Sequence, residues 1–202
     1  MTALRSGALL YCCCCLALSA ACDPATVDAL VERNEGRRES VYKDTLQLKT
    51  IGIGFNLEKN GAAERIAKLE LTFSEVLAGK QSLNNEQIDT LFKADMLTAR
   101  ADALSAVPEL ESLPCQAQNV VVDMAFSLGS RGLKTFKKMR GALSRQDFTA
   151  TAEEIINSLW CRQVRTRCMR ASSMMNHVAY QITLDADGQP GATLHQTSIA
   201  AL

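Results

Sequence analysis

The sequence contains little histidine and few aromatic residues, and both shortages narrow the possible functions. Its only histidines are His177 and His195, and the spacing of its cysteines does not match a zinc site. We therefore expect no bound metal. Aromatic residues make up 5% of the chain, and no signature of an RNA- or DNA-binding module is present, so nucleic acid is a poor candidate partner. The 202 residues suffice for one domain or a compact domain of two lobes.

Residues 1–21 have the features of a signal peptide. An early arginine precedes the apolar run Ala8–Leu18, whose 11 residues are too few to span a membrane as a stable helix. Ser19 and Ala21 are small residues two positions apart, as signal peptidase requires, which predicts cleavage before Cys22. We therefore expect a secreted protein without stable membrane insertion. A retained anchor is the alternative, whereas Ser19 stands where a lipoprotein signal needs an apolar residue, which disfavours lipidation of Cys22.

The cysteines outside this segment predict disulfides. Removing residues 1–21 removes Cys12–Cys15 and leaves an even number: Cys22, Cys115, Cys161 and Cys168. Four cysteines allow three connectivities. On one continuous helix, Cys161 and Cys168 would lie about 10 Å apart along the axis, beyond the roughly 4–7 Å Cα separation of a disulfide. That pair therefore requires a turn between its members.

Charge is unevenly distributed along the chain. Asp23 to Ser130 holds 11 basic and 17 acidic residues, whereas Arg131 to Arg170 holds 10 basic and 3 acidic ones. The basic part suggests an anionic partner. The alternative is a set of helices whose basic faces are merely solvated.

The first part of the chain predicts one helix followed by a small antiparallel sheet. Asp23-Pro24 forms an N-cap with proline at the first helical position, and Glu35-Gly36 ends the helix. From Ser40 to Leu57 the residues favour strands, and isoleucines alternate with glycines at Ile51–Gly54. These glycines predict a strand that another backbone approaches closely.

Beyond Gly61 the pattern is helical to about Tyr180. Asn84 and Gln87 form a capping box before a long amphipathic run that stops ahead of Pro108. A nearly all-apolar helix is expected from Pro114 to Gly129, followed by shorter helices at 133–143, 152–160 and 165–177. We predict an α+β fold with a small sheet lobe and a helical lobe joined by a long helix. The domain should span residues 22–180, and residues 181–202 should form a loosely ordered tail.

Two acids and a threonine fall around the predicted sheet. Glu35 lies at the end of the first helix, Asp44 follows nine positions later, and Thr50 lies on the returning strand. Because the chain turns at Gly36, both carboxyls can face one cleft. Two carboxyls with room for a water between them are what an inverting glycosidase requires. The spacing by itself is common, so the pair alone carries little weight.

The full string resembles the phage-type lysozymes of glycoside hydrolase family 24. The matching residues begin with Glu35-Gly36, Tyr42-x-Asp44-Thr45 and the block Thr50-Ile-Gly-Ile-Gly. Further collinear matches are Asp123–Gly129, Gly132, Phe136, Ser158–Trp160, Arg167 and Arg170. The resemblance covers roughly residues 27–177, and the Thr-Ile-Gly-Ile-Gly block is fairly specific.

This resemblance implies a role for each matched residue. Glu35 would be the general acid, and Asp44 with Thr50 would position the attacking water. Asn56 and Phe126 fall at positions that contact the glycan, and Tyr42 and Arg167 would line or support the cleft. The implied reaction is inverting cleavage of the β-1,4 bond between N-acetylmuramic acid and N-acetylglucosamine in peptidoglycan, by a monomer without cofactors. A cation near a general acid lowers its pKa, so burial must compensate.

Several positions depart from the family pattern. The loop Leu46–Lys49 lacks an expected glycine, Phe55 replaces a frequent histidine, and Asn56 replaces an apolar residue. Cys161 and Cys168 fall where the family has a turn, which supports a local bond. The changes at Leu46–Lys49 and Phe55 keep a glycan-binding or toxin-like module without turnover as an alternative. The unmatched tail leaves room for a third, an inhibitor or a structural helical protein. Phe126 and Trp160 also have an alternative interpretation, as core residues.

Overall fold

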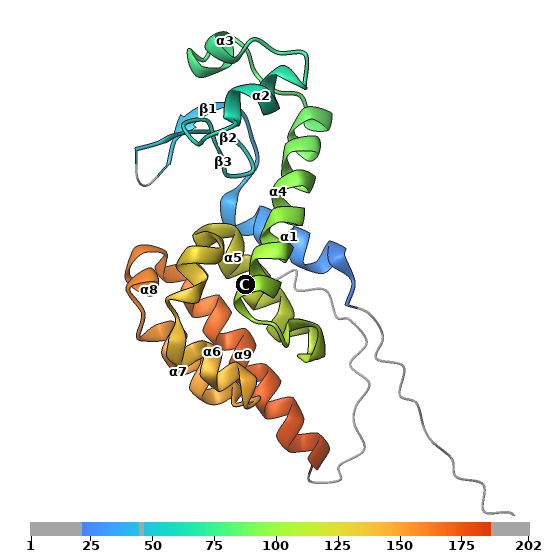
Figure 1. Cartoon of the computed structure of the whole chain (residues 1–202), viewed down its shortest axis with the longest axis vertical. Coiled ribbons are helices and arrows are strands. Elements are labelled where there is room, and N and C mark those ends of the chain that lie inside the picture. The colour runs from blue at the N-terminus through green and yellow to red at the C-terminus, as the bar shows by residue number, and fades with distance from the viewer. Residues whose placement is uncertain (1–21, 45–46, 187–202) are drawn as a thin grey trace, which may run out of the picture.

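The computed structural model describes residues 22–44 and 47–186 of the chain. These residues form two lobes, with a small sheet in one and a helical bundle in the other (Figure 1). The long helix α4 and the segment between α1 and β1 both run from one lobe to the other (Figure 1). The predicted α+β architecture is therefore confirmed.

Helix α1 (Pro24–Glu35) lies in the helical lobe and begins and ends where the sequence predicts. The side chain of Asp23 accepts a hydrogen bond from the Ala25 N–H at 3.0 Å. Gly36 ends the helix at φ +75°, and its N–H donates to the carbonyl of Glu32. A left-handed residue at a helix end is the usual place for glycine. The consequence is a sharp exit from α1 directly after Glu35.

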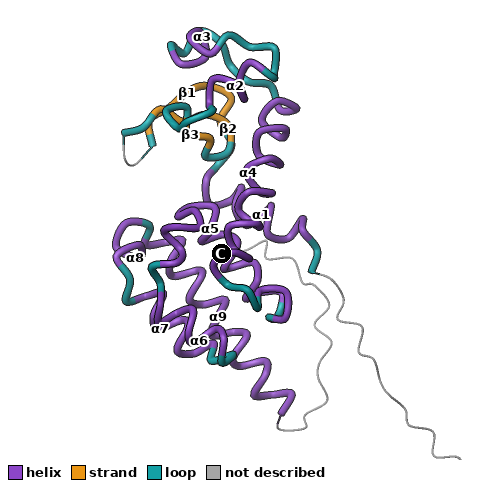
Figure 2. Tube along the Cα trace, in the orientation of Figure 1, coloured by secondary structure: helices purple, strands orange, loops and turns teal. Residues whose placement is uncertain are grey.

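The sheet lobe contains three antiparallel strands in the order β1 (Arg38–Lys43), β2 (Lys49–Gly52) and β3 (Phe55–Asn56). Helices α2 (Ala62–Ala67) and α3 (Phe73–Leu77) complete the lobe (Figure 2). The Thr-Ile-Gly-Ile-Gly block is not one continuous strand, because β2 ends at Gly52 and a turn leads into β3. Both Gly52 (φ +65°) and Gly54 (φ +69°) adopt left-handed conformations that suit glycine.

Helix α4 (Asn85–Ala106) is the predicted long helix and starts with the predicted capping box. The Asn84 side chain accepts from the Gln87 N–H, and the Gln87 side chain accepts from the Asn84 N–H. The helix contacts β2 and β3 near its start and packs along α5 farther on. One helix therefore supports both lobes.

The helical lobe is built around α5 (Cys115–Lys134), whose middle is buried as predicted. Gly129 (φ +65°) interrupts α5 at the expected stop, but helical structure resumes immediately to Lys134. The remaining elements are η1 (Leu110–Ser112), α6 (Lys137–Ser144), α7 (Phe148–Ile156), α8 (Leu159–Gln163) and α9 (Arg165–Ala186). Helix α9 runs past Gln181, where we expected the tail to begin, and the rest of that predicted tail lies outside the described residues.

Two disulfides join the four cysteines. Cys22 pairs with Cys115 at a Cα separation of 5.3 Å, and Cys161 pairs with Cys168 at 5.0 Å. Val164, between α8 and α9, has non-helical dihedral angles and supplies the turn that the second pair requires. Among the described residues, no helix is long and apolar enough to cross a membrane.

Candidate active site

Glu35 is in direct contact with Arg167. Arg167 lies in the first turn of α9, and its Nη1 donates to Oε1 of Glu35 at 2.5 Å. The two residues are 132 positions apart in the chain. The Glu35 side chain is 22% exposed and the Arg167 side chain is 10% exposed, so the pair is largely shielded from water. The packing of α1 and α9 on α5 brings the two residues together.

Arg167 makes most of its hydrogen bonds to a second carboxylate, Asp123 of α5. Its Nε donates to Oδ2 at 3.0 Å, and its Nη2 donates to Oδ1 and to the main-chain oxygen, both at 2.9 Å. The Asp123 side chain is only 3% exposed. Burial by itself lowers the pKa of Arg167, but the charges and hydrogen bonds of Asp123 and then Glu35 outweigh it and raise that pKa. Arg167 is therefore a permanent cation shared between two carboxyl groups.

Asn34 ties the end of α1 into the same network. Its Nδ2 donates to Oδ1 of Asp123 at 2.8 Å, and its Oδ1 accepts a hydrogen bond from Arg170. Burial, followed by the charge of Arg33, lowers the pKa of Arg170. Asn34 thus holds the backbone that carries Glu35 against both α5 and α9.

Gly54 lies directly against the carboxyl of Glu35. A Cβ atom at this glycine would stand 2.9 Å from Oε2 of Glu35, closer than real contacts allow. Our prediction that these glycines admit another backbone is therefore wrong for Gly54, because the group that comes close is a side chain. Its positive φ and this contact both require glycine.

Tyr42, Thr50 and Asn56 form one row across the sheet. Tyr42 is opposite Thr50 on β1 and β2, and Thr50 is opposite Asn56 on β2 and β3. Burial, then the negative charge of Glu35, and more weakly that of Asp44, raise the pKa of Tyr42. Tyr42 thus experiences the charges of both predicted catalytic acids. Asn56 is engaged locally, since its side-chain oxygen accepts the Glu58 N–H at 2.7 Å.

Asp44 closes the loop between β1 and β2. Its N–H donates to the carbonyl of Leu48 at 3.0 Å, and its Oδ1 accepts the Leu48 N–H at 2.9 Å. Gln47 adopts the left-handed conformation, with φ +66°. The chain therefore makes a glycine-like turn without the expected glycine. Thr50 is 3% exposed, and its hydroxyl donates to the same Leu48 carbonyl at 3.2 Å.

Phe126 and Trp160 contribute to the packing of the helical lobe. Phe126 is partly buried and meets Phe92 of α4 edge to face, with ring centroids 6.0 Å apart. Trp160 is 4% exposed, and its indole N–H donates to Oγ of Ser127 at 3.1 Å. Trp160 is thus a core residue, while Phe126 is only partly buried where α5 packs against α4.

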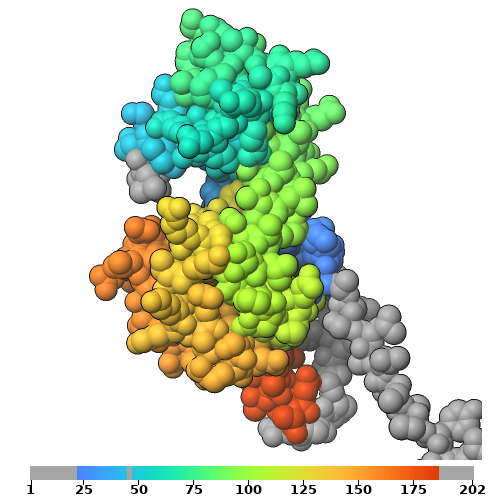
Figure 3. All heavy atoms as spheres, viewed as in Figure 1, coloured from blue at the N-terminus to red at the C-terminus, as the bar shows by residue number. Residues whose placement is uncertain are grey.

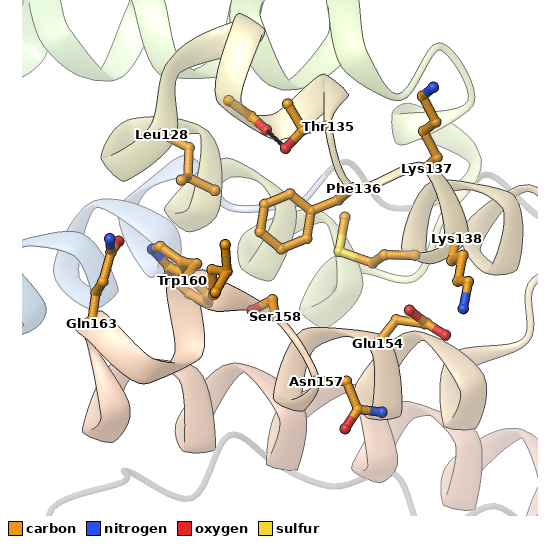
Figure 4. Close-up of a pocket in the computed structure, with 13 residues that line it drawn as sticks. Leu128, Thr135, Phe136, Lys137, Lys138, Glu154, Asn157, Ser158, Trp160 and Gln163 are labelled. Atoms are coloured by element: carbon orange, nitrogen blue, oxygen red, sulfur yellow. Dashed lines mark hydrogen bonds between the residues drawn. The ribbon is translucent and has the colours of Figure 1, made fainter.

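Two hollows lie near these residues. Figure 3 shows a recess between the sheet lobe and the helical lobe, on the side of α4 where β1 lies. A second hollow of about 640 Å³ lies within the helical lobe, between the ends of α5 and α7 and the starts of α6 and α8. In Figure 4, Phe136 points toward Trp160 at its floor, with Lys138 and Glu154 at one side. In the part of the chain that the structure describes, no group of three or more acidic, histidine or cysteine side chains is arranged to hold a metal.

Sequence reasoning assigned no role to Asn34 or Asp123, and it did not predict the contact of Gly54 with Glu35. The signal for Asp123 was present: it is an acid within an otherwise apolar helical segment, where a buried charge requires a partner. Asn34 and Gly54 carried no such signal, because their partners come from distant elements.

Comparison with known proteins identifies relatives of the whole two-lobed unit. The phage lysozyme family model matches residues 32–171. "Probable T4-type lysozyme 1" of Dictyostelium discoideum is 26% identical over 163 residues, which cover 75% of this chain and 94% of that protein. "Probable T4-type lysozyme 2" of the same organism is 26% identical over 155 residues, which cover 72% of this chain and 90% of that protein.

A phage protein is similar over a comparable stretch. The "Pre-baseplate central spike protein Gp5" of Enterobacteria phage T4 is 27% identical over 154 residues. The match covers 72% of this chain but only 27% of the spike protein, so the likeness concerns one part of that longer protein. The family model spans the sheet lobe, α4 and the helical lobe as far as the first turns of α9, including Glu35, Asp44, Thr50 and Arg167. The chain therefore belongs to the phage lysozyme family.

Proposed function

We propose that this protein is a secreted lysozyme that cleaves the β-1,4 bond between N-acetylmuramic acid and N-acetylglucosamine in peptidoglycan, with inversion. The observation that carries the proposal is the position of Glu35. Its carboxyl is held by Arg167, lies against Gly54 and acts on Tyr42 together with Asp44. Membership in the phage lysozyme family supports the hydrolase class and the peptidoglycan substrate.

Glu35 is the general acid in this proposal, and its two oxygens have different surroundings. Oε1 accepts from Nη1 of Arg167, so the transferable proton belongs on Oε2. Oε2 is the oxygen nearest Gly54, on the side of the carboxyl that faces the sheet lobe. Protonation of the glycosidic oxygen from Oε2 leaves the carboxylate charge next to Arg167, which stabilises it as the bond breaks.

Asp44 and Thr50 position the water in this proposal. The Thr50 hydroxyl already donates to the Leu48 carbonyl, so toward a water it acts as a hydrogen-bond acceptor. The Asp44 carboxylate, oriented by the Leu48 N–H, accepts a proton from that water as it attacks the face opposite the leaving group. We propose that Phe126 and Asn56 contact the glycan, as the family resemblance implies.

Localisation rests on the sequence and is supported by the cysteines. Residues 1–21 act as a signal peptide in this proposal, and cleavage before Cys22 leaves a domain that ends with α9. Disulfides persist in oxidising compartments, and all four cysteines from Cys22 onward are paired. The Cys22 sulfur is occupied by Cys115, which fits a secreted monomer better than a lipid-anchored protein.

The test is a turbidity assay on suspended bacterial walls with purified protein. Wild type should clear the suspension and release reducing ends, whereas E35Q should not, with an unchanged circular dichroism spectrum. NMR of the first product anomer reports the stereochemistry, and the α-anomer is expected for inversion of a β bond. Clearing by folded E35Q would overturn the assignment of Glu35. Wall binding by wild type without release of reducing ends would instead favour the glycan-binding alternative.

A further inference from the structure

Arg167 creates a difficulty for Glu35 as a general acid. An acid must keep its proton at the working pH, but a cation at hydrogen-bond distance favours the ionised carboxylate. The Nη1 of Arg167 lies 2.5 Å from Oε1 of Glu35. Another group must therefore weaken the effect of Arg167 if Glu35 is to act as proposed.

Asp123 is placed to do this. Arg167 directs three hydrogen bonds to Asp123, from Nε and Nη2, and only its Nη1 to Glu35. Two guanidinium nitrogens, Nε and Nη2, bind the two oxygens of the Asp123 carboxylate in a bidentate pair. Bidentate pairs of arginine and carboxylate are among the strong hydrogen-bonded ion pairs. At 3% exposure, the Asp123 charge is little screened by water. Glu35 therefore faces an arginine whose charge is largely balanced by another carboxylate.

We infer that Asp123 is a positioning residue for the reaction: by neutralising and orienting Arg167, it keeps Glu35 protonated up to the pH at which the enzyme works. This inference rests on the proposed role of Glu35 as general acid. It gives Arg167 and Asp123 a joint function. Arg167 orients Oε1 of Glu35, while Asp123 orients Arg167 and offsets part of its charge.

The other charged groups around Glu35 do not replace Asp123. From α9, Arg170 donates to Asn34, and from α1, Arg33 adds further positive charge. From β1, Tyr42 carries no charge near neutral pH, since a tyrosine ionises only near about pH 10, and burial raises the pKa of Tyr42 further. Asp44, which follows β1, also acts on Tyr42. Asp44 is the proposed base for the water. The hydrogen bonds of Arg167 go to Glu35 and Asp123. Among these groups, Asp123 is thus the carboxylate that offsets the cation next to Glu35.

Substitution D123N keeps the shape of the side chain and removes its charge. The Arg167 charge then acts on Glu35 without compensation. An opposite charge within about 4–6 Å shifts carboxyl ionisation by about 1–3 pH units, and Asp123 supplies part of that balance. In D123N, we expect the alkaline limb of the kcat/KM profile to move about one pH unit lower. At a fixed pH on that limb, this shift corresponds to about a tenfold loss of activity.

The experiment measures kcat/KM against pH for wild type, D123N, D123E and R167Q on one soluble peptidoglycan oligosaccharide. D123E retains the charge and should keep the wild-type limb. R167Q removes the cation, and its limb should move higher. In the R167Q background, D123N should cause a smaller shift. The matched control is D95N, which breaks another partly buried aspartate–arginine pair, with Arg65, and should leave the limb unchanged.

A second measurement does not depend on turnover. The carbon-13 resonance of the Glu35 carboxyl, followed against pH, should move its midpoint about one unit lower in D123N than in wild type. An unchanged midpoint of the Glu35 resonance in folded D123N would overturn the inference. An unchanged alkaline limb of the kcat/KM profile in R167Q would also overturn it, and this second test does not require D123N to fold. A shift in D123N that persists fully in the R167Q background would show that Asp123 does not act through Arg167. Activity in E35Q would instead defeat the proposed function, so the two failures are distinguishable.

Discussion

The two disulfides should separate stability from activity, because they close very different lengths of chain. Cys22 and Cys115 are 93 positions apart, whereas Cys161 and Cys168 are 7 apart. In the chain-entropy model, opening the long loop lowers the free energy of unfolding by about 4.6 kcal/mol and opening the short one by about 2.5 kcal/mol. The variant C22S/C115S should therefore be the less stable of the two.

The order should reverse for activity. Cys168 directly follows Arg167, and the bond to Cys161 holds the turn between α8 and α9 from which Arg167 reaches Glu35. Opening this bond lets the start of α9 shift, and a displacement on the order of 1 Å at a catalytic group can cost up to about 100-fold in rate. Cys22 lies before the start of α1, whereas Glu35 lies at its far end. We expect about a tenfold loss of kcat for C161S/C168S and less than twofold for C22S/C115S.

The assays are urea unfolding followed by circular dichroism, and wall clearing at a temperature where both variants are folded. Each serine pair is the control for the other, because each removes one disulfide and adds two hydroxyls. If C22S/C115S lost as much activity as C161S/C168S, the link from the short disulfide to Arg167 would be refuted. Equal losses of stability would refute the assignment of the larger entropic effect to the longer loop.

Three further predictions concern the sheet lobe. G54A should lose at least about tenfold in kcat and about 1–2 kcal/mol of stability, because its methyl group would press on Oε2 of Glu35. G61A, at a similar φ of +79° in open space, should lose only stability, and equal activity in both variants would contradict this. Q47G should raise the free energy of unfolding by about 0.5–1 kcal/mol, because glycine removes the backbone strain of a left-handed glutamine. Q146G should do the same, since Gln146 has φ +55°. A lower urea midpoint in either variant would show that the backbone there is not strained. Because the pKa of Tyr42 is raised above 10.0, the folded state holds a proton that the unfolded state loses above about pH 10. Stability should fall as pH rises through that range, and Y42F should lack this part of the slope in melting temperatures from pH 9 to 11.5.

The sequence by itself determined the elements whose boundaries depend on local chemistry. The Asp23 cap, the exit at Gly36 and the capping box at Asn84 involve residues a few positions apart, and the structure has each of them as predicted. The family motif likewise identified the two-lobed fold, since its spacings reflect how α1, the sheet and α5 succeed one another. It also indicated that Arg167 belongs near Glu35.

Only the tertiary structure decided how these residues act on one another. The balance between Glu35, Arg167 and Asp123 depends on the packing of α1, α5 and α9, which meet across separations of 44 and 132 positions. The left-handed turn at Gln47 and the six extra residues of α9 were likewise missed. Residue type predicts such features poorly where tertiary packing overrides local preference. The sequence therefore singled out Glu35 as the proposed acid. Its close contacts with Arg167 and Gly54 exist only once α1, α9 and the sheet lobe have packed.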